Sequence, residues 1–251
     1  QALRAWLETL ALTLGLALTL GLALAASPAL VRPTLDYVEI VTGGAQAEDP
    51  LPLIIAIHGM GDRPEHFSRL FAGLPAKARV ILPRAPIPQG DGASWYPSRR
   101  QCGGDARAHS QGIDDAVEAL AHLTRHLTLI RPTTGKALVT GFSQGGVLSF
   151  QLALRYPELW RASLPIAGEI PAPLLPHPPV LGKPDPVIRA MHGRVDPVFA
   201  LPATEEAVHT LADLGFDATI TAYEGLAHRT NAALRRDLFA LIQAAVSAGP
   251  K

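Results

Sequence analysis

Hydrophobic and polar residues follow two different periods along most of this chain. Short, nearly continuous apolar runs are typical of strands buried on both faces of a parallel sheet, and they lie at 53–57, 79–82, 136–140, 161–166, 187–191 and 217–223. A weaker alternation predicts an edge strand at 34–41. Between the strands, apolar residues recur at helical spacing at 64–73, 111–130, 144–156, 203–214 and 229–247. Strands that alternate with helices predict an α/β fold with a mostly parallel, doubly wound sheet and helices on both faces.

The first 26 residues follow neither period. From Leu10 to Ala26 the chain carries no charge, and the stretch is slightly longer than a signal h-region and slightly shorter than a bilayer span. Ala23-Leu24-Ala25 is a small-x-small cleavage pattern. We interpret residues 1–26 as a secretory signal peptide, which predicts a periplasmic or secreted protein. The alternatives are an uncleaved membrane anchor through residues 10–26 and a helix of the folded domain.

Composition agrees with a single domain over residues 27–251. Apolar residues make up 48% of the chain, and the formal net charge is +0. No run of Lys or Arg is present, so nothing indicates a nucleic-acid partner. Cys102 is the only cysteine, which excludes an intramolecular disulfide. No residue cluster has the spacing of a metal site, and we expect neither a metal nor a cofactor.

A short motif follows the predicted strand at 136–140. The sequence Gly141-Phe142-Ser143-Gln144-Gly145 lies between that strand and the next predicted helix. A serine on a sharp strand-to-helix turn needs glycines on both sides, because its backbone is strained and neighbouring chains approach closely. We interpret Ser143 as a nucleophile that attacks a carbonyl carbon. A chance match is the alternative.

A nucleophilic serine needs a base and an acid that orients the base, and in this architecture the chain order is serine, acid, histidine. Asp196 follows the predicted strand at 187–191, and His228 follows the strand at 217–223. Since parallel strands place their carboxyl ends at one edge of the sheet, we predict a triad of Ser143, Asp196 and His228. The competitors are Asp185, which precedes its strand, and the strand-end histidines His58 and His192, for which loop hydrogen bonds are the simpler role.

A glycine-rich segment after the strand at 53–57 completes the predicted site. The sequence His58-Gly59-Met60-Gly61-Asp62 is an early strand-to-helix loop. An oxyanion hole in this architecture uses the N–H of the residue after the nucleophile and one from such a loop, which indicates Gln144 and Met60. Trp95, Tyr96 and Phe199 are candidate walls of the substrate pocket, with core packing as the alternative for each.

These motifs, with His192-Gly193-Arg194-Val195-Asp196-Pro197 and Tyr223-Glu224-Gly225-Leu226-Ala227-His228, resemble the phospholipase/carboxylesterase family over roughly residues 35 to 246. The family includes bacterial carboxylesterases, acyl-protein thioesterases and lysophospholipases. The resemblance implies an α/β-hydrolase fold without a large lid domain, no metal, and the same triad and oxyanion residues. Ser94-Trp95-Tyr96 resembles the family's substrate-facing loop. Arg99-Arg100-Gln101-Cys102-Gly103-Gly104 and the proline-rich stretch at 165–186 depart from the family pattern.

We therefore expect a serine carboxylesterase that hydrolyses short to medium acyl esters, with a small-molecule ester as its partner. A thioesterase, a lysophospholipase or an acyltransferase would share the triad and remains an alternative. A non-catalytic binding protein on a hydrolase scaffold is the alternative from another class. Its hallmark is the loss of a triad or oxyanion residue, and none is lost here.

Overall fold

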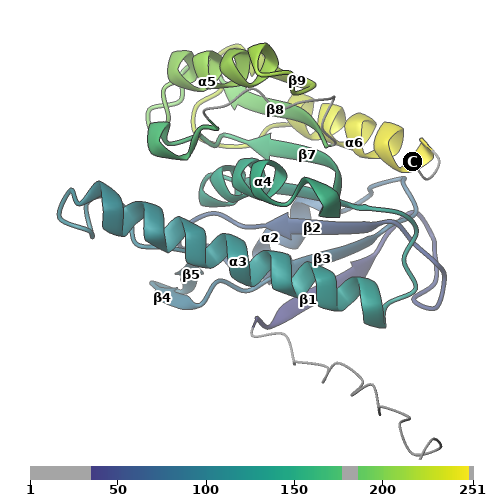
Figure 1. Cartoon of the computed structure of the whole chain (residues 1–251). Coiled ribbons are helices and arrows are strands. Elements are labelled where there is room, and N and C mark those ends of the chain that lie inside the picture. The colour runs from purple at the N-terminus through teal and green to yellow at the C-terminus, as the bar shows by residue number, and fades with distance from the viewer. Residues whose placement is uncertain (1–34, 177–185, 249–251) are drawn as a thin grey trace, which may run out of the picture. The chain divides into compact units, whose positions relative to one another are not determined.

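A seven-stranded sheet runs through the computed structural model, which describes residues 35–176 and 186–248 (Figure 1). The strand order is β1-β3-β2-β6-β7-β8-β9. The bounds are β1 Tyr37–Val41, β2 Leu53–Ile57, β3 Arg79–Pro83, β6 Ala137–Phe142, β7 Trp160–Ile166, β8 Val187–Gly193 and β9 Ala218–Tyr223. Edge strand β1 pairs antiparallel with β3, and the remaining neighbours are parallel. The predicted α/β-hydrolase fold and the predicted edge strand are confirmed.

Helices cover both faces of the sheet because the inner strands are apolar on both sides. One face carries α3 (Ala106–Ile130), α4 (Gln144–Arg155) and α5 (Leu201–Asp213), and the other carries α2 (Pro64–Phe67) and α6 (Ala232–Ser247). Strand β2 illustrates the division. Its Ile55 and Ile57 pack in the cluster that contains α3 residues, whereas its Ile54 packs in the cluster with Leu238 of α6.

The sheet reverses its winding direction between β2 and β6. From β2 the chain passes to β3 on one side, whereas from β6 it continues through β7, β8 and β9 on the other. Strands β2 and β6 are direct neighbours, with Ile57 paired to Gly141 near their carboxyl ends. The loops after these two strands therefore meet at the switch point, where open α/β sheets bind their ligands.

Three local predictions differ from the structure. The helix expected at 64–73 is only α2 followed by a 3₁₀ segment, Ser68–Phe71, which ends before Gly73 at φ +76°. Helix α3 begins at Ala106, earlier than expected, because the Asp105 side chain accepts hydrogen bonds from the next turn. A small hairpin, β4 (Ile87–Gln89) and β5 (Gly92–Ser94), was not anticipated.

Further short 3₁₀ segments are Pro157–Leu159 and Ala172–Leu174. The second belongs to the proline-rich stretch, which returns to β8 next to β7 as expected. Residues 177–185 and the segment 1–26, with its predicted signal peptide or anchor, lie outside the described residues. Over 35–176 and 186–248, we find no helix with the length and apolar character needed to span a bilayer.

Candidate active site

The side chains of Ser143, His228 and Asp196 form one hydrogen-bonded chain at the carboxyl edge of the sheet. His228 Nε2 lies 2.8 Å from Ser143 Oγ, and His228 Nδ1 lies 2.7 Å from Asp196 Oδ2. Ser143 follows β6, Asp196 follows β8 and His228 follows β9. The structure therefore brings together the three residues that the sequence indicated, from strands far apart along the chain.

The neighbours of Asp196 determine where the protons lie in the hydrogen bonds that join Ser143, His228 and Asp196. Its Oδ1 accepts hydrogen bonds from the N–H groups of Val198 and Phe199, at 2.8 and 3.0 Å. Burial acts to raise the pKa of Asp196, but the bonds from His228 and these two amides outweigh it and lower the pKa below its usual value. An ionised carboxylate only accepts, so the proton lies on Nδ1 of His228 and Nε2 accepts from the Ser143 hydroxyl.

Ser143 occupies a sharp turn with φ +58° and ψ −116°, a backbone conformation that residues other than glycine rarely adopt. The turn brings the backbone of residue 145 against β2, and a Cβ there would lie 2.0 Å from the Ile57 carbonyl oxygen. Only glycine fits at this position. The Ser143 N–H donates to Ile166 of β7 at 3.0 Å, which holds the turn against the sheet. The nucleophile position is thus held by both neighbouring strands.

Two backbone N–H groups near Ser143 remain available as donors. Within the described residues, no backbone hydrogen bond uses the N–H of Met60 or of Gln144. Gln144 is the first residue of α4, where helix N–H groups have no partner inside the helix. The Met60 loop lies against the serine turn, since a Cβ on Gly59 would meet Ser143 Cβ at 3.3 Å. The two predicted oxyanion donors therefore flank Ser143.

Side chains hold these loops in place. The Gln144 amide accepts from the Trp95 N–H at 3.0 Å and donates to the Tyr96 carbonyl at 2.9 Å. His58 is buried, with Nδ1 2.8 Å from the Gly59 carbonyl and Nε2 3.3 Å from the Ala85 N–H. Burial lowers the pKa of His58, and its bond to Gly59 opposes this only in part. His58 is thus a neutral support of the Met60 loop.

A cavity of about 300 Å³ opens beside Ser143. It is lined by Met60, Tyr96, Ser98, Arg99, Arg100, His109, Ser143, Gln144, Val147, Glu169, Pro171, Val198 and Phe199. Tyr96 and Phe199 are thus placed where the sequence suggested. Trp95 is not. It is 2% exposed and lines a separate cavity, because its ring packs against His58 and its Nε1 donates to the His58 carbonyl at 2.9 Å.

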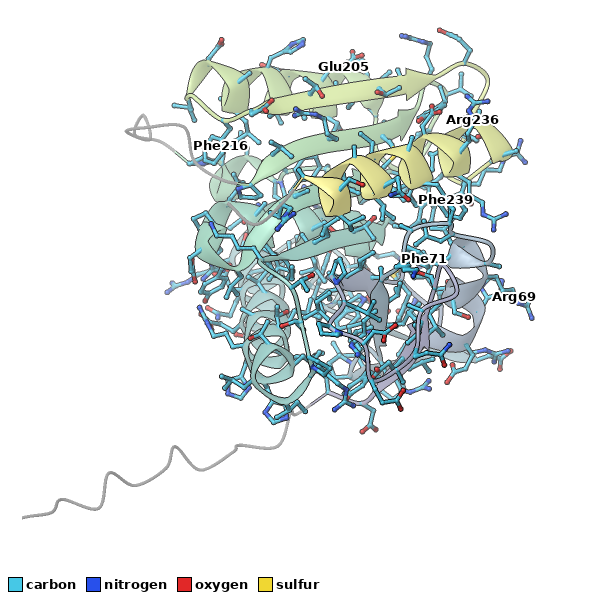
Figure 2. All side chains as sticks on the ribbon, turned by 90° about the vertical axis from the view of Figure 1, so that its right-hand side faces the viewer. Arg69, Phe71, Glu205, Phe216, Arg236 and Phe239 are labelled. Carbon is cyan, nitrogen blue, oxygen red and sulfur yellow. The ribbon has the colours of Figure 1, made fainter. Side chains whose placement is uncertain are left out.

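A second cavity, of about 410 Å³, is lined by His228, which does not line the first. Phe142 and the cationic residues Arg69, Arg229 and Arg235 contribute to its lining. Figure 2 shows Arg69 pointing outward on the side of the molecule that carries α6. The Ser143–His228 hydrogen bond joins the two cavities, because Ser143 lines the first and His228 the second.

The rival residues have other roles. His192 is buried and its Nε2 lies 2.9 Å from the Phe199 carbonyl, so it supports the loop that carries Asp196. His58 supports the Met60 loop, and Asp185 lies outside the described residues. Among the residues described, no group of three or more His, Cys, Asp or Glu side chains could hold a metal ion.

Sequence reasoning missed Glu169 and His109 as lining residues. His109 Nδ1 lies 3.0 Å from the Pro97 carbonyl, and its ring packs edge-on against Tyr96. Glu169 lies within 165–186, a stretch that departs from any recognisable motif. Hydrophobic periodicity could not assign either residue to the cavity, because His109 precedes the predicted helix start and Glu169 follows a predicted strand.

Comparisons with known proteins agree with this geometry. A model of the phospholipase/carboxylesterase family matches residues 36–244. The solved structure of esterase PE8 is similar with a TM-score of 0.69 at 23% identity, covering 84% of this chain and 98% of that one. The acyl-protein thioesterase 2 of Zea mays (TM-score 0.66, 19% identity, 84% and 99% coverage) and the carboxylesterase of Bacillus cereus (0.66, 13%, 85% and 96%) share the fold.

Among the curated relatives, a match over a shorter span is informative about length. The magnesium-chelatase 30 kDa subunit of Rhodobacter capsulatus is 32% identical over 123 residues. The match covers 49% of this chain and 36% of that protein, so the chain spans little more than a third of this relative's length.

Proposed function

Because the chain belongs to the phospholipase/carboxylesterase family, we propose that it is a serine carboxylesterase that hydrolyses short to medium acyl esters. The observation that carries the proposal is the unbroken chain of hydrogen bonds from Asp196 through His228 to Ser143. The lowered pKa of Asp196 keeps its carboxylate ionised, as its role of orienting the imidazole requires.

In the first step, Ser143 Oγ attacks the ester carbonyl while its proton moves to His228 Nε2. Asp196 holds the imidazole in the required tautomer and stabilises the imidazolium that forms. The N–H groups of Met60 and Gln144 bind the oxyanion of the tetrahedral intermediate. His228 then protonates the departing alcohol, which leaves an acyl group on Ser143.

In the second step, water takes the place of the alcohol. His228 removes a proton from the water molecule as the latter attacks the acyl carbonyl, and the same two N–H groups bind the new oxyanion. Collapse of this intermediate returns the proton to Ser143 and releases the carboxylic acid. Rigid positioning by Gln144 and His58 keeps the donors in place in both steps.

The cavity beside Ser143 supports the proposed size of the acyl group. Its volume of about 300 Å³ and its apolar lining by Val147, Val198 and Phe199 suit a short to medium chain. Met60 lines this cavity and is 46% exposed, so the cavity reaches the surface at this residue. We accordingly expect soluble esters to be preferred, without activation at an oil–water interface.

The test is hydrolysis of 4-nitrophenyl esters from acetate to palmitate by the purified protein and by Ser143→Ala. The substitution should lower kcat by on the order of 10³-fold or more, because the nucleophile is lost while the fold is kept. A variant that keeps more than about a tenth of the activity would contradict the nucleophile assignment. Matched thioesters, and an added acceptor alcohol, distinguish the thioesterase and acyltransferase alternatives. No turnover by the folded wild type would favour a binding protein.

A further inference from the structure

The cavity beside Ser143 has a charged side as well as an apolar one. The charged side is formed by Arg99 and Arg100, from the loop before α3, and by Glu169, which follows β7. Arg99 pairs with Glu169 at 3.0 Å. The Arg100 guanidinium makes no hydrogen bond or ion pair with the residues that the structure describes. The three charges leave this side of the cavity with one uncompensated positive charge.

Tyr96 adds a hydrogen-bond donor to the same side. The residue is 3% exposed and lines the cavity, and its hydroxyl makes no hydrogen bond within the described chain. Burial raises the pKa of Tyr96, so the hydroxyl keeps its proton and can act as a donor. The Tyr96 hydroxyl is not among the fully buried polar atoms that lack a partner, so it is accessible from the cavity and can donate a hydrogen bond to a ligand.

The direction of the reaction decides which part of the ester meets these groups. In the proposed mechanism the departing oxygen takes its proton from His228, so the alcohol leaves on the side of His228 and the second cavity. The acyl group stays on Ser143 and occupies the first cavity, which Ser143 itself lines. Arg100 and the Tyr96 hydroxyl therefore face the acyl group rather than the alcohol.

We infer that the site prefers acyl groups that end in a carboxylate, that is, monoesters of short dicarboxylic acids. The apolar side chains contact the methylene groups, while Arg100 and the Tyr96 hydroxyl bind the terminal carboxylate. Hydrolysis consumes one water and releases the alcohol and the dicarboxylate. The inference rests on the proposed function, since it requires acyl transfer to Ser143, and it adds a recognition role for residues outside the triad.

The test compares kcat/KM for mono-4-nitrophenyl glutarate and 4-nitrophenyl valerate, which differ only by a carboxylate in place of the terminal methyl group. We expect the wild type to prefer the glutarate about 5-fold or more, as a partly exposed charge-assisted contact allows. Arg100→Gln should bring the preference close to unity, and Tyr96→Phe should reduce it. Glu169→Gln should increase it, because a competing carboxylate is removed. Arg107→Gln, an exposed arginine of α3 outside the cavity, is the matched control and should change neither kcat/KM.

Three outcomes would overturn the inference. One is turnover of the valerate without a preference for the glutarate, and another is a preference that Arg100→Gln leaves intact. The third is a preference for a carboxylate on the alcohol, measured with 3-carboxyphenyl valerate against phenyl valerate, that Arg100→Gln abolishes, because Arg100 would then face the alcohol. Each of these would leave the proposed esterase activity standing. Absence of turnover with every ester would instead overturn the proposed function and the inference together.

Discussion

The backbone of Ser143 holds a conformation that is unfavourable for any residue with a Cβ. Its φ of +58° is unusual outside glycine, and such positions cost about 1–3 kcal/mol each. The bond from Ser143 N–H to Ile166 and the close packing of Gly145 against β2 maintain the turn in spite of this cost. In return, the hydroxyl is presented above the sheet and within reach of His228.

Alanine and glycine at position 143 both lack the hydroxyl, so the difference in stability between these two variants reports the effect of the Cβ. Ser143→Gly should be more stable than Ser143→Ala by roughly 0.5–2 kcal/mol. Glycine relieves the backbone strain, and the greater conformational freedom of its unfolded chain offsets only part of that gain. Urea denaturation of the two inactive variants measures the difference in the free energy of unfolding. An alanine variant as stable as the glycine variant would show that the turn is not strained.

His58 should make the stability of the fold depend on pH. Its pKa is lowered in the folded protein, so below about pH 6.5 the unfolded chain takes up a proton that the folded chain does not. This contribution is present above that pH and is lost as the pH falls towards the folded value. Wild type should thus lose stability on acidification faster than His58→Asn, by at most about 1.4 kcal/mol per pH unit. Denaturation between pH 5 and 8 measures this, and parallel curves would contradict it.

At the scale of elements, the loops after β2, β6, β8 and β9 carry the residues of the candidate site, and the strands position these loops. The loop of residues 95–105 is different, because side chains from elsewhere anchor it at its start and at Arg99. Gln144 holds Trp95 and Tyr96, and Arg99 pairs with Glu169. The Trp95 ring is buried against His58 and lines a separate cavity, whereas Phe199 lines the cavity beside Ser143, so the two aromatic residues should behave differently.

Phe199→Ala should shift the preferred acyl chain to longer esters, because it enlarges the cavity. Short chains lose contact with the ring, and each methylene that is no longer buried weakens their binding by about 0.8 kcal/mol. Trp95→Phe should leave the optimum in place and lower stability by about 1–3 kcal/mol, since it removes a buried hydrogen bond and packing. A series of 4-nitrophenyl esters and thermal denaturation provide the two readouts. A shifted optimum for the Trp95 variant would place that ring at the substrate after all.

Edge strand β1 could be predicted from its weak alternation and the other six strands from short apolar runs. Ser143, Asp196 and His228 could be predicted because each follows such a run. The hairpin of β4 and β5 could not, since Ile87–Gln89 and Gly92–Ser94 are short and lack apolar alternation. Trp95 and Tyr96 are adjacent aromatic residues, and only the packing of His58 decides that one faces the core and the other the cavity. Glu169 reaches the cavity through tertiary pairing with Arg99, which no local pattern encodes.

At the scale of the whole molecule, every group assigned to the site lies within residues 58–228. Deleting residues 1–26 should consequently leave kcat/KM for 4-nitrophenyl butyrate unchanged. If those residues are a signal peptide, the full-length chain expressed in a bacterium should be recovered outside the cytoplasm in shortened form. An unprocessed chain found solely with the membranes would favour the anchor, and loss of activity on deletion would mean that the segment belongs to the domain.

Covalent labelling with an organophosphate tests the central claim most directly, because it needs no knowledge of the substrate. A nucleophile activated by His228 and Asp196 should take up one label per chain, with loss of esterase activity in parallel. Peptide mass spectrometry should place the label on Ser143, and Ser143→Ala should take up none. A label on another residue, or equal labelling of the alanine variant, would contradict the account.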